Sequence, residues 1–77
     1  MKTNDILNMA KTYGLPFEIE EWGGVDHISV TNASGQPYFE FKEVDGRICV
    51  MTCFGIKGKH GYVDDETIAN MIKELAA

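Results

Sequence analysis

The sequence predicts an α+β domain in which an N-terminal and a C-terminal helix pack on one face of a four-stranded antiparallel meander, in the order α-β-β-β-β-α. Apolar residues at both ends of the chain follow helical spacing, whereas the middle of the chain alternates apolar and polar residues as strands do. Turn signals divide the middle, and Asp45-Gly46 is the clearest of them. The length of 77 residues predicts one domain over residues 1–77.

The first helix is predicted over residues 4 to 13, with Thr3 or Asn4 as its cap. Gly14 can adopt the left-handed conformation that ends a helix, and Pro16 prevents the helix from resuming. The apolar stripe has the i, i+3, i+4, i+7 spacing of one helix face and comprises Ile6, Met9, Ala10 and Tyr13.

Two strands are predicted over residues 17 to 22 (F-E-I-E-E-W) and 27 to 32 (H-I-S-V-T-N), joined by a turn at Gly23-Gly24. Successive side chains of a strand point to opposite faces, so the alternation assigns each residue to one face of the sheet. The expected core face comprises Phe17, Ile19, Ile28 and Val30, and the opposite face of the first strand carries Glu18, Glu20 and Trp22.

Asp45-Gly46 suits a two-residue type I′ hairpin between the third and fourth strands. The resulting register sets Phe41 opposite Val50 and Phe39 opposite Thr52. One face then carries Phe39, Phe41, Ile48 and Val50, and the other carries Tyr38, Glu40, Lys42, Cys49, Met51 and Cys53.

The last helix is predicted to begin after Asp64, which can act as its N-cap. Val63 and Ile68 stand at the two positions of a hydrophobic staple, and Asp65 and Glu66 suit the positive end of the helix dipole. The inward stripe comprises Ile68, Met71, Ile72 and Leu75.

The net charge of −5 disfavours binding to nucleic acid or to an anionic membrane, and it suits a partner protein with a basic surface. We expect no direct nucleic-acid or membrane partner. The N-terminus lacks the apolar run of a secretory signal, and two cysteines are too few for a disulfide-stapled scaffold. These features predict a cytoplasmic protein.

Cys49 and Cys53 are expected to share one strand face about 13 Å apart, too far for a disulfide and poorly spaced for zinc. We therefore expect free thiols, no stoichiometric metal and no cofactor. Asp26 and His27 are neighbours on a strand and point to opposite faces, so they do not form a catalytic dyad. The sequence predicts a protein that is not an enzyme.

Residues 53 to 61 (C-F-G-I-K-G-K-H-G) gather glycines, lysines and a histidine in an otherwise acidic chain. The spacing differs from that of a phosphate-binding P-loop, and Asp64 to Glu66 occupy the helix N-terminus that would receive the anion. The segment is expected to be a connector. A small phosphate-ligand site at residues 55–61 remains an alternative.

The leading function is a small acidic, non-enzymatic protein-binding module, an inhibitor or adaptor that docks on a basic surface of a larger protein. Aromatic and methionine side chains beside carboxylates have the composition of a protein-binding patch. Small acidic proteins of this kind occur among phage counter-defence factors such as anti-CRISPR inhibitors. The expected partner-binding residues are Glu18, Glu20, Trp22, Tyr38, Glu40, Met51, Lys57 and Lys59.

The segments I-L-N-M-A-K-T-Y-G-L-P at 6 to 16 and G-G-V-D-H at 23 to 27 resemble the first helix and first loop of double-stranded-RNA-binding domains. The helix–sheet–helix order is similar too. That family has three strands and a lysine cluster at the start of its second helix, whereas this chain has V-D-D-E-T there. The resemblance implies a degenerate domain of this type that no longer binds RNA and serves homodimerisation.

Overall fold

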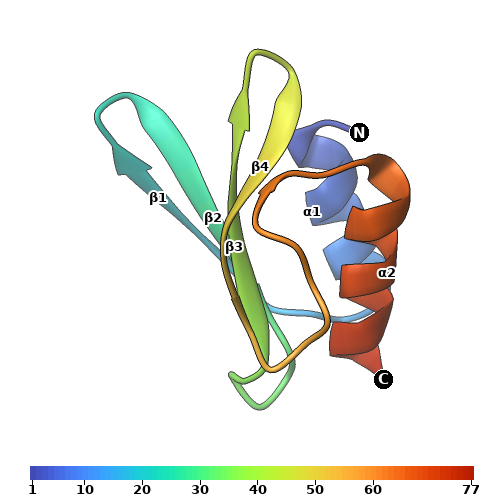
Figure 1. Ribbon diagram of the computed structural model, residues 1–77. Helices are drawn as coiled ribbons and strands as arrows, with labels where there is room; N and C mark the ends of the chain where they lie inside the picture. The colour runs from blue at the N-terminus through green and yellow to red at the C-terminus, as the bar shows by residue number, and fades with distance from the viewer.

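The computed structural model describes residues 1–77 and confirms the predicted α+β architecture, with both helices on one face of an antiparallel sheet (Figure 1). The strands follow the chain order β1-β2-β3-β4-β5 across the sheet. Neither helix is long and apolar enough to cross a membrane. The elements are α1 (Thr3–Thr12), β1 (Phe17–Trp22), β2 (Val25–Thr31), β3 (Tyr38–Val44), β4 (Arg47–Phe54), β5 (Gly61–Tyr62) and α2 (Asp65–Ala76).

A fifth strand extends the predicted four-stranded meander. β5 has two residues and pairs antiparallel with β4, where Tyr62 lies opposite Cys49 and Gly61 opposite Val50. A strand this short leaves no alternating pattern in the sequence, so only the folded chain shows it. It carries the β4–α2 connection along one edge of the sheet.

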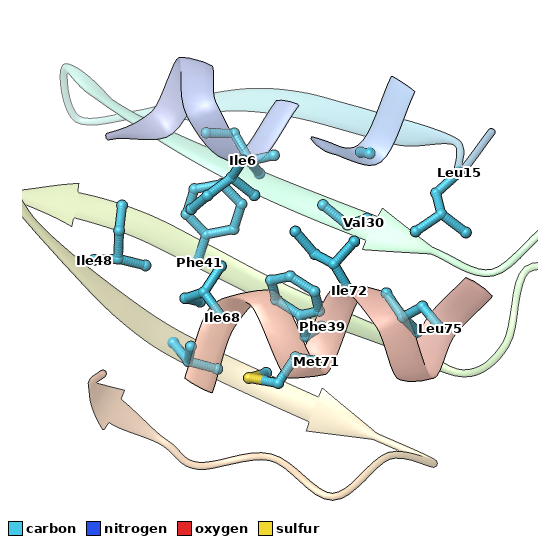
Figure 2. Packing of buried hydrophobic residues seen from close by; sticks show 13 residues of the cluster. Ile6, Leu15, Val30, Phe39, Phe41, Ile48, Ile68, Met71, Ile72 and Leu75 are labelled. Atoms are coloured by element: carbon cyan, nitrogen blue, oxygen red, sulfur yellow. The ribbon is translucent and has the colours of Figure 1, made fainter. Parts of the chain in front are cut away.

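The core lies between the helices and the sheet (Figure 2). Phe39 and Phe41 of the central strand β3 are fully buried, and Figure 2 shows them facing side chains of both helices. No polar or charged residue is buried. The buried residues are Ile6, Ala10, Leu15, Ile28, Val30, Phe39, Phe41, Ile48, Val50, Ile68, Met71, Ile72 and Leu75.

The prediction that Ile19 belongs to the core is wrong, because half of its surface (50%) is exposed. The β1–β2 hairpin leans away from the helical layer toward its Gly23-Gly24 turn, so the helices cover only its base (Figure 1). Phe17, at the base, is partly buried and packs against the core. The outer half of the hairpin therefore has two uncovered faces.

A register shift in β4 overturns part of the predicted β3–β4 pairing. Phe41 lies opposite Val50 as expected, but Phe39 lies opposite Cys53 and not Thr52. Met51 is the extra residue of a β-bulge, which moves every later residue of β4 to the other face. Cys53 therefore packs against the core, and the expectation that it shares a face with Cys49 is wrong.

The two helices begin differently from one another. Asp64 caps α2 as predicted, since its carboxylate accepts the Thr67 N–H at 2.9 Å. α1 begins one residue earlier than predicted, with Lys2 at the cap position. Thr3 instead donates both its N–H (2.8 Å) and its hydroxyl (3.0 Å) to the carboxylate of Glu43. These bonds fasten the start of α1 to β3 and hold the pKa of Glu43 below its usual value.

Candidate protein-binding surface

The sheet face opposite the helices, here called the outer face, has no element packed on it (Figure 1). Several large apolar side chains are exposed on this face. Trp22 is 65% exposed and Met51 is 40% exposed. Phe54 and Tyr62 are about half exposed. The outer face is therefore both uncovered and partly apolar.

An open hollow of about 280 Å³ lies on the outer face across β1, β2, β3 and β4. Three carboxylates and no lysine or arginine line it, so the hollow has a strongly negative rim with an indole and a thioether beside it. The lining residues are Glu18, Glu20, Trp22, His27, Ser29, Glu40, Met51 and Thr52.

Trp22 owes its position to the hairpin turn that follows it. Gly23 and Gly24 both have positive φ angles, 59° and 80°, as a type I′ turn requires, and this turn sets Trp22 opposite Val25. The indole N–H donates to the Glu20 carboxylate at 3.0 Å. The indole ring also lies 5.7 Å from the His27 ring, centroid to centroid. These contacts hold the indole over the hollow while leaving most of its surface exposed.

Tyr38 lies on the outer face beside the hollow and not in it. Its ring stacks on Phe54 at a centroid distance of 5.9 Å. Tyr38 also lines a neighbouring depression that shares Glu18 and Ser29 with the hollow. The aromatic surface therefore continues from Trp22 past the carboxylates to Tyr38 at the start of β3.

Positive charge on the outer face is confined to the part that lies near the turn between β3 and β4. The Arg47 guanidinium lies over the Tyr62 ring at 4.2 Å from its centroid, and Lys42 shares the outer-face side of β3 with Glu40. Neither cation lines the hollow. The face thus has an acidic, Trp-containing half and a smaller basic end.

The structure brings together most of the expected partner-binding residues and separates two of them. Lys57 and Lys59 lie in the β4–β5 connection beside α2, in the helical layer, and line a different depression with Thr67 and Asn70. The backbone N–H of Lys57 donates to the carboxylate of Glu74 in α2 at 2.9 Å. The expected residues that share the outer face are Glu18, Glu20, Trp22, Tyr38, Glu40 and Met51.

Gly58, in the same connection, has a packing role. A Cβ built on this residue would overlap the Cys53 Sγ and approach the Met71 Cε to 3.0 Å. The chain therefore passes directly over the edge of the core, which only glycine permits at this distance. This close passage supports the expectation of a connector, but the connector is shorter than predicted, because Cys53 and Phe54 belong to β4 and Gly61 to β5.

The sequence reasoning missed three residues of the hollow and two aromatic residues of the outer face. His27 and Ser29 alternate with the buried Ile28 and Val30, so the strand pattern could have placed them there. Thr52 reaches the hollow only because of the β-bulge, and the sequence pattern of β4 does not predict a bulge. The two missed aromatic residues are Phe54 and Tyr62.

Among the side chains that line the hollow there is a single hydrogen bond, from the Trp22 indole to the Glu20 carboxylate. His27 and Ser29 make no side-chain hydrogen bond to each other or to a carboxylate. No three histidine, cysteine, aspartate or glutamate side chains come together as metal ligands. The absence of catalysis and of metal stays a prediction.

Comparison of the chain with protein-family models, with curated proteins and with solved structures finds no match.

Proposed function

We propose that the protein is a small non-enzymatic binding module, an inhibitor or adaptor, that docks its outer face on a basic surface of a larger protein. The observation that carries this proposal is the hollow, which gathers Glu18, Glu20 and Glu40 with Trp22 and Met51 on a face that nothing in the chain covers.

The chemistry of the hollow suits a cationic side chain of a partner. An arginine or lysine can lie against the exposed face of Trp22 and form charge-assisted hydrogen bonds with the carboxylates. Met51 supplies a flexible apolar contact beside them. The partner's apolar atoms would displace water from the aromatic surface, which provides most of the affinity at such interfaces.

The net charge of −5 adds a long-range contribution. Opposite charge on the partner speeds the encounter, and salt screens this attraction. A basic surface that ordinarily binds nucleic acid has the required charge, and covering such a surface is one way in which phage counter-defence inhibitors act. An inhibitory role of that kind belongs to this proposal.

The test begins with isolation of partners from host lysate at low and high salt, followed by calorimetry on the purified partner. Trp22→Ala should weaken binding by about tenfold or more, as for a central aromatic anchor. Glu20→Lys should weaken binding and flatten its salt dependence. Glu66→Lys, which makes the same change of charge on α2, is the matched control and should bind like the wild type.

Equal loss of binding in Glu20→Lys and Glu66→Lys would show that only net charge matters, and the outer face would then have no specific role. Binding unchanged by Trp22→Ala would also contradict the proposal. Light scattering on the free protein distinguishes homodimerisation, because a dimer that Trp22→Ala dissociates would assign the outer face to a second copy.

A further inference from the structure

The free edge of the sheet, at β1, offers a second kind of contact. β1 pairs only with β2, and no other strand lies beside it. The opposite edge is blunted, because β5 has only two residues. Every residue of β1 after Phe17 is exposed. A six-residue strand with an open edge is a template for pairing with another strand.

The hydrogen-bond register shows which backbone groups are free. The Thr31 N–H donates to the Pro16 carbonyl at 3.0 Å. In an antiparallel pair every second residue of a strand bonds to its partner strand, so Glu18, Glu20 and Trp22 of β1 bond to β2. The N–H and C=O groups of Ile19 and Glu21 therefore point away from β2. They are the donors and acceptors that an added strand would use.

A second copy of the chain does not suit this edge. Like charges placed directly opposite each other destabilise a strand pair. Two-fold antiparallel pairing of β1 with itself brings carboxylates together in each central register. It sets Glu18 opposite Glu18, Glu18 opposite Glu20, Glu20 opposite Glu20, or Glu21 opposite Glu21.

The side chains of β1 define the strand that would fit. Glu18 and Glu20 lie on the outer face, two positions apart, and favour basic residues at two alternate positions of the added strand. Between them, the half-exposed Ile19 lies on the other face and favours an apolar residue. The required pattern is basic–apolar–basic.

We propose that β1 accepts an extended basic–apolar–basic segment of the partner by strand addition, so that the sheet continues into the partner. This inference rests on the proposed function, and it specifies that the basic surface of the partner includes an extended strand. The added strand would lie along the rim of the hollow, and its basic side chains would reach Glu18 and Glu20 on the outer face.

The test uses a capped peptide Thr-Val-Arg-Val-Arg-Val-Thr and a scrambled peptide Val-Val-Arg-Arg-Thr-Val-Thr of equal composition. In the scrambled peptide the adjacent arginines point to opposite faces of a strand. In NMR titrations, the alternating peptide should bind roughly fivefold more tightly than the scrambled peptide. It should also slow the exchange of the Ile19 and Glu21 amide protons, which a strand on the free edge would bond.

Glu21→Pro is the decisive variant, because it removes one outward N–H and leaves the β1–β2 bonds and the outer face intact. Glu21→Gln is the charge-matched control. We expect Glu21→Pro to lose peptide binding and Glu21→Gln to keep it, with circular dichroism confirming that both are folded. The exchange measurement on the wild type is independent of any failure of the proline variant to fold.

Equal binding of both peptides, or binding to neither, would overturn strand addition. So would tight binding by folded Glu21→Pro. If the Arg-containing peptide shifts only Trp22, His27 and Thr52 signals, strand addition fails while docking on the outer face survives. If Glu21→Pro loses the partner but Trp22→Ala does not, the edge is the contact and the proposed use of the outer face fails.

Discussion

At the residue scale, Asp64 makes a pH-dependent contribution to stability. Hydrogen bonds from Thr67, first from its side chain and then from its backbone N–H, hold the pKa of Asp64 below the ordinary 3.8. The charged carboxylate therefore stabilises the fold at pH values above 3.8, and this stabilisation is lost as the pH falls through the lowered pKa. Asp64→Ala should lower Tm by a few degrees at neutral pH, as loss of an N-cap does.

Thermal unfolding followed by circular dichroism between about pH 7 and pH 2.5 measures this effect. The gap in Tm between the wild type and Asp64→Ala should close at the acid end. Asp64→Asn is the matched control, because asparagine caps helices as well as aspartate does but has no charge to lose. A gap that stays constant down to acid pH would contradict the assignment.

The two cysteines should differ in reactivity. Burial, and after it the charge of Glu74, raises the pKa of the Cys53 thiol, and the Cys53 side chain packs beside Gly58 at the core. Cys49 lies on the other face of the sheet. Because the thiolate is the reactive form, iodoacetamide near pH 7.5 should label Cys53 roughly tenfold more slowly than Cys49, measured by mass spectrometry of peptides. Glu74→Gln should narrow the difference, and equal labelling would contradict this account.

At the element scale, the connection between β4 and β5 depends on a close approach. Gly58→Ala should destabilise the protein by about 1–3 kcal/mol, as overpacking does, because the new methyl group would overlap the Cys53 Sγ. Urea denaturation measures the change in the free energy of unfolding. Gly58→Ala combined with Cys53→Ala removes the obstructing sulfur and should be less destabilised than the sum of the single variants. Additive single effects would show that the overlap is not the cause.

The elements that repeat a pattern over several residues could be predicted, and the irregular ones could not. The stripe of α2 and the Asp45-Gly46 turn fix a helix and a hairpin through local chemistry. The bulge at Met51 depends on how β4 fits its neighbours, so it was not predicted, and the predicted register therefore placed Cys53 on the wrong face of the sheet. Of the candidate site, the carboxylates of β1 came together with Trp22 because strand alternation alone fixes their face.

The loop lysines show the limit of that reasoning. Lys57 and Lys59 have no periodic neighbours, so the sequence could not say toward which layer they turn. Their place beside α2 follows from the path of the connection over Gly58. Exposure of Ile19 has a similar origin, because it depends on where the helices lie over the sheet and not on the residues around it.

At the scale of the whole molecule, the sheet has a well-covered centre and a poorly covered arm. The central strand β3 buries Phe39 and Phe41 beneath both helices, whereas the outer half of the β1–β2 hairpin lies beyond them (Figures 1 and 2). Few buried apolar contacts hold the arm, so its hydrogen bonds should open without unfolding the rest. The arm also carries Trp22 and the free edge at Ile19, so the proposed contact regions should be the least protected part of the sheet.

Native-state amide hydrogen exchange followed by NMR tests this division. The amides of Glu20 and His27, bonded to each other across the arm, should exchange about a hundredfold faster than that of Val30, which lies opposite Phe39 in the covered part. Phe41→Ala should lower the free energy of unfolding by about 3–5 kcal/mol. The exchange rate of the Val30 amide should therefore rise by the factor that corresponds to the whole loss of unfolding free energy. The exchange rates of the Glu20 and His27 amides should be nearly unchanged. A common response of all three amides would mean that the sheet opens as one unit, and binding at the arm would then stabilise the core directly.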